Sequence, residues 1–127
     1  MATIDDVQRI ALTFPEVTEK LAWGNTTWRV NDKTFVWDRP LGKKDRAELG
    51  DAAPDGPTMG VHAEDLSEKQ ALLESDPDVF FTITHFDKYA MLLVRLDAVD
   101  VDRLTQIIED AWLARAPTKL AETYLAR

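Results

Sequence analysis

Apolar residues recur every three or four positions in two stretches of the chain, and this spacing predicts helices over 3–14 and 100–115. A capping-box pattern predicts another helix over 65–75, and a proline suited to a first turn predicts a short last helix over 117–124. The residues expected to cap helix starts are Thr3 with Asp6, Asp65 with Glu68, and Asp100.

Shorter apolar runs lie between these helices and predict strands. The predicted strands span 18–23, 26–30, 33–37, 58–63, 79–84 and 91–96. We expect Gly24 and Asn25 to form one turn. Asn31 and Asp32 predict a tight hairpin, because both residue types tolerate the left-handed backbone that such a turn needs.

The predicted hairpin sets an expected register for its two strands. With two residues in the turn, Trp28 lies opposite Phe35 and Thr26 opposite Trp37. Side chains alternate between the faces of a strand, and the more apolar face should be the buried one. That face is predicted to carry Trp28, Val30, Phe35 and Trp37, and the other face Arg29, Thr34, Val36 and Asp38.

The predicted order is one helix, four strands, a helix, two strands and two helices. This order favours an α+β fold, with a mostly antiparallel sheet and helices packed on one face. The length suits a single domain over 1–127. The stretch 39–57 holds three glycines and three prolines, so we expect a long loop with one helical turn near 44–49.

Composition and charge narrow the choice of class and partner. The chain has no cysteine, which excludes disulfides and cysteine nucleophiles. No apolar run reaches the length of a membrane span, and two aspartates stand where a signal peptide would carry cations, so we expect a cytoplasmic protein without a membrane partner. The net charge is −8, yet residues 32–46 hold five cations against three aspartates and form a basic island, which is also typical of a solvated loop.

Candidate chemistry is sparse. There is no nucleophile elbow, P-loop or dinucleotide fingerprint, so no catalytic residue and no cofactor is assigned. His85, oriented by Asp87, is the one acid–base pair to consider, beside the simpler interpretation of residues 84–89 as a polar strand connection. His62 and His85 could join nearby carboxylates around an ion, but their spacing matches no ligand motif, and no metal site is predicted.

Three stretches combine into a familiar pattern: "LTFPEVTEKLAWGNTTWRVNDKTFV" at 12–36, "HFDKYAMLLVRL" at 85–96 and "AWLARAPTKL" at 111–120. Together they resemble the MmcQ/YjbR family over nearly the whole chain. The resemblance implies an α+β fold similar to that of CyaY, the bacterial frataxin. The chain departs from the family pattern at Asp87, where Asn is frequent, and at Met91, where Trp is frequent.

Members of this family are commonly labelled DNA-binding proteins, so the resemblance implies a non-enzymatic module with DNA as its partner. The net charge of −8 opposes such binding at long range. The expected phosphate contacts are Arg29, Lys33, Arg39, Lys43, Lys44 and Arg46. The alternative is a small-ligand or peptide-binding domain with a pocket around the sheet and the 84–89 connection. Its expected pocket residues are Trp23, Trp37, His85, Asp87 and Lys88, and the sequence leaves the oligomeric state open.

Overall fold

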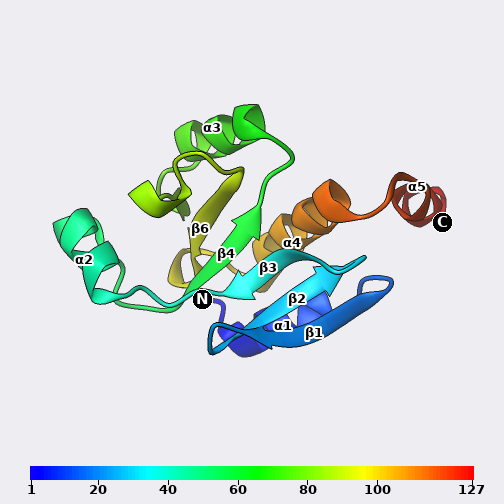
Figure 1. Ribbon diagram of the computed structural model, residues 1–127, viewed down its shortest axis with the longest axis horizontal. Coiled ribbons are helices and arrows are strands. Elements are labelled where there is room, and N and C mark those ends of the chain that lie inside the picture. Colours follow the sequence, from blue (N-terminus) through cyan, green and yellow to red (C-terminus); the bar gives the residue numbers. More distant parts are fainter.

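Six strands form one sheet in the order β1-β2-β3-β4-β6-β5, and every neighbouring pair is antiparallel (Figure 1). The computed structural model describes residues 1–127. The strands are β1 (Val17–Ala22), β2 (Asn25–Val30), β3 (Lys33–Asp38), β4 (Thr58–His62), β5 (Phe80–Phe81) and β6 (Met91–Arg95). The predicted α+β fold with an antiparallel sheet is confirmed.

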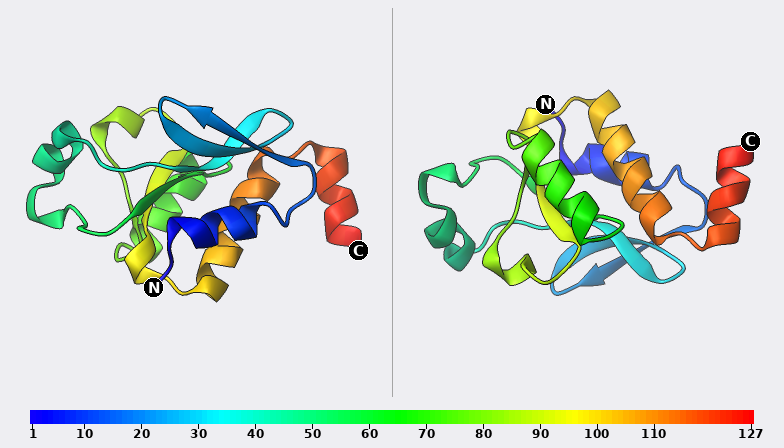
Figure 2. Two further views of the ribbon diagram at one scale, coloured as in Figure 1. Left: turned by 90° about the horizontal axis from the view of Figure 1, so that it is seen from below. Right: turned by 90° about the horizontal axis from the view of Figure 1, so that it is seen from above.

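The α-helices are α1 (Ile4–Ala11), α2 (Lys43–Leu49), α3 (Leu66–Ser75), α4 (Val101–Arg115) and α5 (Thr118–Ala126). Figure 2 shows α1 and α4 together on one side of strands β1 to β3. The main core is formed where these two helices meet the sheet, and its members include Val7, Trp28, Phe35, Leu104 and Ile108. None of the helices has both the length and the apolar character that crossing a membrane requires.

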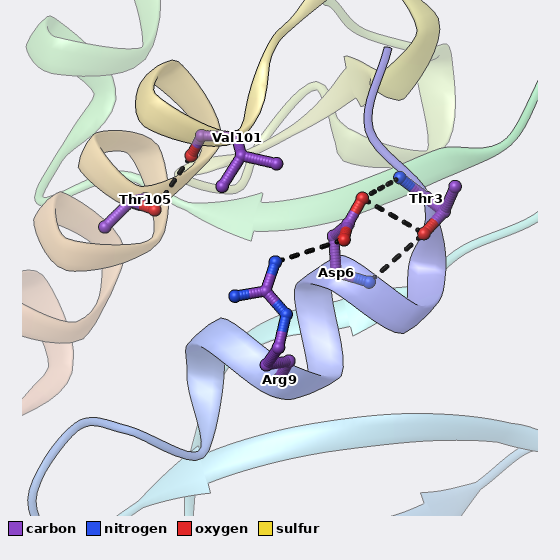
Figure 3. Close-up of polar contacts among 5 residues, drawn as sticks. All are labelled: Thr3, Asp6, Arg9, Val101 and Thr105. Atoms are coloured by element: carbon purple, nitrogen blue, oxygen red, sulfur yellow. Dashed lines mark hydrogen bonds and ion pairs between the residues drawn. The ribbon is translucent and has the colours of Figure 1, made fainter.

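The start of α1 is fixed by a reciprocal pair of hydrogen bonds (Figure 3). The Asp6 amide donates to Thr3 Oγ1 at 3.2 Å, and the Thr3 amide donates to Asp6 Oδ2 at 2.9 Å. Arg9 Nη2 lies 3.1 Å from the other carboxylate oxygen of Asp6. The hydrogen bond from the Thr3 amide is the main reason why the pKa of Asp6 is lowered. The capping box predicted at this site is confirmed.

A β-bulge interrupts the β2–β3 hairpin. Arg29 pairs with Thr34, but the preceding residue, Trp28, pairs with Val36, so Phe35 is an extra residue in β3. Phe35 and Val36 are both fully buried, next to one another in sequence, although regular alternation would separate them.

The bulge overturns the predicted register and two face assignments. Thr27, not Thr26, lies opposite Trp37. The extra residue turns Trp37 to the sheet face away from α1 and α4, so its predicted place beside Trp28 is wrong. Val36 takes the inward position instead. One unpaired residue is enough for this change, because successive side chains of a strand point to opposite faces and one extra residue reverses the order for those that follow.

Three element boundaries also differ from prediction. The first turn is formed by Trp23 and Gly24, with φ of 55° and 82°, and Asn25 already pairs with Ala22 in the sheet. The predicted strand over 79–84 keeps only Phe80–Phe81, because the chain then turns through a 3₁₀ segment, η2 (Thr84–Phe86). The expected single turn near 44–49 is the complete helix α2, which stands at one end of the molecule (Figure 1).

Candidate functional site

The sheet face opposite α1 and α4 carries a hollow of about 560 Å³. Alternation places it there, because Thr27, Arg29, Thr34 and Trp37, which line it, are each adjacent in sequence to a core residue. Asn25 of β2, together with His85 and Phe86 of η2, adds to this part of the lining. Segments distant in sequence therefore meet on one open face of the sheet.

Trp37 covers the middle of this face. It pairs with Gly60 on β4, and a Cβ built on Gly60 would overlap the indole ring. Glycine at this position therefore lets the ring lie close over the neighbouring strand. The His62 ring lies 5.6 Å from the indole and the Phe86 ring 6.2 Å from it, both inclined to its plane. The result is an aromatic floor supported by three segments of the chain.

Two arginines border this floor, and both are held by contacts within the protein. Arg29 Nε donates to Thr27 Oγ1 at 3.1 Å, and its Nη1 lies 3.6 Å from Asp32 Oδ1. Arg39 Nη1 donates to Asp45 Oδ2 at 3.1 Å. The Arg39 guanidinium lies 5.7 Å from the centre of the Phe86 ring, within cation–π range. Both side chains are thus ordered before any ligand arrives.

The two histidines at the hollow differ in environment. Burial, assisted by the positive charge of Arg115, lowers the pKa of His62 to about 4. His62 is therefore neutral at pH 7 and can both donate and accept a hydrogen bond. His85 is exposed, and its ring lies 5.8 Å from that of Phe86. His85 makes no hydrogen bond with Asp87, so the structure does not join them as a catalytic pair.

A buried lysine holds the η2 side of the hollow. Lys69 of α3 is only 6% exposed, and its Nζ donates to the carbonyl oxygens of Phe86 at 2.6 Å and of Tyr89 at 2.8 Å. Burial lowers its pKa, partly offset by the negative charge of Asp87. On the other side, the Thr84 amide donates to Glu48 Oε2 of α2 at 2.8 Å. The segment is anchored to both helices.

Sequence reasoning did not identify Lys69, although one signal was available. Lys69 lies three positions before Leu72 and four before Leu73, which both pack against the core, so it occupies the apolar stripe of its helix. A lysine in such a stripe indicates a buried amine with specific acceptors. Those acceptors lie 17 and 20 residues further along the chain, beyond what local spacing reveals.

Three of the predicted pocket residues line the hollow, namely Trp23, Trp37 and His85. Asp87 and Lys88 are exposed on the same connection but lie outside the lining. Trp23 stands at the rim, in the β1–β2 turn, and is 99% exposed. The residues that the pocket hypothesis omitted but the lining includes are Ala22, Asn25, Thr27, Arg29, Thr34, Arg39, His62, Phe86 and Met91.

The six cations predicted to contact nucleic acid fall into separate groups. Arg29 and Arg39 border the hollow, and Lys33 is exposed beside the β2–β3 turn. Lys43, Lys44 and Arg46 are exposed on α2. Figures 1 and 2 place the β2–β3 turn and α2 at opposite ends of the molecule. The six residues therefore do not form one continuous basic surface.

The side chains considered for a metal site do not converge. No group of three His, Asp or Glu side chains is placed to hold a metal ion. His62 and His85 both face the hollow, but no carboxylate accompanies them in its lining. The chemistry of the site is accordingly that of aromatic rings, imidazoles and guanidinium groups.

Comparison with known proteins identifies the family. A sequence model of the YjbR family matches residues 12–114. Uncharacterized protein Mb2600 of Mycobacterium bovis and uncharacterized protein Rv2570 of Mycobacterium tuberculosis are each 42% identical over 129 residues, covering 99% of this chain and 98% of each relative. The crystal structure of Deinococcus radiodurans protein DR2400, a DUF419 protein, has the same fold, with a TM-score of 0.68 at 16% identity over 99% of this chain and 89% of that one. The chain therefore belongs to the YjbR family, as the resemblance of its motifs predicts.

Proposed function

We propose that this protein is a non-enzymatic binding module that holds a small molecule in the hollow of its open sheet face. The observation that carries the proposal is the placement of Trp37. This large aromatic side chain is turned away from the main core, packs against a second apolar cluster that includes Phe81 and Phe86, and is still only half-buried. An indole in this position exposes apolar area to water, and a ligand that covers it gains the free energy of burial.

The dimensions and lining of the hollow support the same function. Its volume, about 560 Å³, lies in the range typical of small-molecule sites. Met91 adds apolar surface next to Trp37, and Thr34 offers a hydroxyl group at a fixed strand position, whereas the Thr27 hydroxyl is already bonded to Lys20 O and Arg29 Nε. A few placed polar groups around an apolar floor are the usual composition of a ligand site.

A ligand screen with a local readout tests this proposal. Isotope-labelled protein is mixed with a fragment library of acidic, basic and neutral compounds, and the NMR signals of the Trp37 indole N–H and the Met91 methyl group are followed. Thr34→Phe should fill the hollow and abolish binding, whereas the matched variant Thr105→Phe, exposed on α4 and outside the lining, should retain it. If no compound moves either signal, the proposal fails.

The nucleic-acid hypothesis stays a prediction with its own test. Lys43, Lys44 and Arg46, exposed within one turn of α2, are the feature that favours it. If α2 contacts phosphates, a mobility shift at low salt should weaken steeply at moderate salt and disappear in a Lys43→Glu/Lys44→Glu double variant. Binding that ignores both changes would contradict contact through α2.

A further inference from the structure

We propose that the ligand of the hollow is a planar aromatic anion, with its ring stacked on Trp37 and its acidic group held by Arg29 or Arg39. This inference rests on the proposed function and specifies the class of compound that the site selects.

The charge of the lining is opposite to that of the molecule. The chain has 23 acidic residues against 15 Lys and Arg, yet the 12 residues around the hollow include two arginines, two histidines and no Asp or Glu. An anion that reaches the floor therefore meets cations and neutral groups, although the rest of the surface repels it. This reversal of sign favours an anionic ligand over a neutral or cationic one.

Arg29 and Arg39 lie on either side of Trp37 along the strand direction. Arg29 is paired with Thr34, three positions before Trp37, and Arg39 follows Trp37 by two positions. At about 3.3 Å per residue the two arginines are separated by roughly 15 Å of strand, before their long side chains are taken into account. A flat ring on the indole thus has a guanidinium group within reach at each end.

Each arginine keeps donors for a ligand. Arg29 uses Nε on Thr27 and Nη1 on Asp32, which leaves Nη2 without a partner in the protein. Arg39 uses Nη1 for both Pro40 O and Asp45, which leaves Nε and Nη2. Asp32 and Asp45 offset part of the positive charge, but they also fix the planes of the guanidinium groups. Planar N–H groups of this kind match the geometry of carboxylate and phosphate oxygens.

The indole accounts for the aromatic part of the ligand. One face of Trp37 rests over Gly60, so the ring presents a flat surface to the hollow. Stacking on such a surface favours planar rings over flexible chains. Neutral His62, next to the indole, can exchange hydrogen bonds with polar atoms on the ring.

Charge-matched pairs of compounds provide the test. The pairs are 2-naphthoate with 2-naphthamide and AMP with adenosine, and inorganic phosphate serves as an acid without a ring. Binding is followed through the NMR signals of Trp37 and Met91. We expect the charged member of at least one pair to bind at least about tenfold more tightly than its neutral partner, because charge-assisted hydrogen bonds have this strength. The preferred pair tells whether the acid is a carboxylate or a phosphate.

Variants of the two arginines show which of them holds the acidic group of the ligand. Arg29→Gln is the cleaner change, because the partners of Arg29 lie within its own hairpin, and Arg39→Gln completes the pair. At least one should reduce binding of the anion about tenfold while leaving its neutral analogue unaffected. Arg46→Gln removes an exposed arginine outside the lining and should change nothing.

A measurement without any ligand gives an independent answer. Trp28 and Trp112 are buried, so in a Trp23→Phe variant Trp37 is the indole left for a quencher to reach. Relative to free N-acetyltryptophanamide, iodide should quench its fluorescence at least about twofold more effectively than caesium, and the double Arg→Gln variant should remove this difference. An iodide-to-caesium ratio equal to that of the free reference would contradict an attractive site for anions.

The outcomes separate the two proposals. If neutral and anionic members of each pair bind equally well and shift the Trp37 signal, the selection of anions is wrong, but the hollow remains a ligand site. If inorganic phosphate binds as tightly as AMP, the aromatic requirement is wrong. If nothing in the set or in the wider library shifts the signals of the hollow, both proposals fail.

Discussion

The indole of Trp37 occupies the space that a side chain at Gly60 would need. The two residues are paired across β3 and β4, and a Cβ at position 60 would overlap the ring. Gly60→Ala should therefore displace the indole and lower the free energy of unfolding by about 1–3 kcal/mol, the usual range for overpacking. Urea denaturation measures this change.

The matched test places the same substitution in a Trp37→Leu background. With the large ring absent, Gly60→Ala should become neutral or slightly stabilising, because alanine is more favourable than glycine inside a strand. An equal loss of stability in both backgrounds would show that position 60 does not depend on Trp37.

Lys69 should control the order of residues 84–89. Lys69→Met leaves the carbonyl oxygens of Phe86 and Tyr89 without their buried donor, so we expect a loss of about 2 kcal/mol in the free energy of unfolding. Amide hydrogen exchange in 84–89 should accelerate, because opening of this segment becomes easier. Lys88→Met changes an exposed lysine of the same segment and serves as the control. Unchanged exchange in Lys69→Met would refute the anchoring role.

His62 should make the protein less stable in acid. Its pKa is about 4 in the folded protein against an ordinary value of 6.5, so the unfolded chain binds the proton more readily. Stability is therefore lost as pH falls from about 6.5 toward 4, by at most roughly 3 kcal/mol. His62→Gln should remove this part of the pH dependence, whereas His85→Gln should retain it.

Urea unfolding at pH 7.5 and pH 4.5 measures the effect of His62, and an NMR titration of its ring gives the pKa directly. Carboxylates also titrate over this interval, so the informative quantity is the difference between the wild-type protein and His62→Gln. A ring that titrates near 6.5 in the folded state would contradict the buried, neutral histidine.

Trp23 occupies a backbone conformation that suits asparagine better. Its φ is 55°, followed by Gly24 at 82°, and Asn-Gly is the preferred sequence for a turn of this kind. Trp23→Asn should therefore stabilise the protein by about 1 kcal/mol and raise the midpoint of thermal unfolding by a few degrees. Leu21→Asn, at an exposed strand position, should give no such gain. A lower midpoint for Trp23→Asn would mean that the exposed indole contributes to stability.

Local patterns in the sequence predicted four of the five helices, because α1, α3, α4 and α5 each have a start signal within a few residues, whereas α2 was expected only as a single turn. Asp65 caps α3 by accepting from the Glu68 amide, and Asp100 caps α4 by accepting from the Arg103 amide, as expected. The family was predicted by its motifs, and its members' likeness to CyaY stays a prediction.

The floor of the hollow was harder to predict, because it depends on pairing between strands. A two-residue turn was correctly placed at Asn31 and Asp32, but the bulge beyond it was not. One clue was present in the sequence, because Phe35, Val36 and Trp37 are three consecutive apolar residues. A regular strand with one solvent-exposed face would place at least one of them in water. Which of them turns outward is decided by packing against β4, where Gly60 leaves room for the indole.

The single extra residue in β3 has a consequence for how relatives are aligned. Side chains alternate between the two faces of a strand, so the number of residues between the β2–β3 turn and Trp37 decides which face its indole occupies. An odd number and an even number give opposite faces. A homologue that kept Trp28 and Trp37 but lacked the extra residue in β3 would direct both rings into its core. Its outer sheet face would then have no aromatic floor. In a sequence alignment, the position of a gap in β3 therefore says more than percentage identity about which relatives share the hollow.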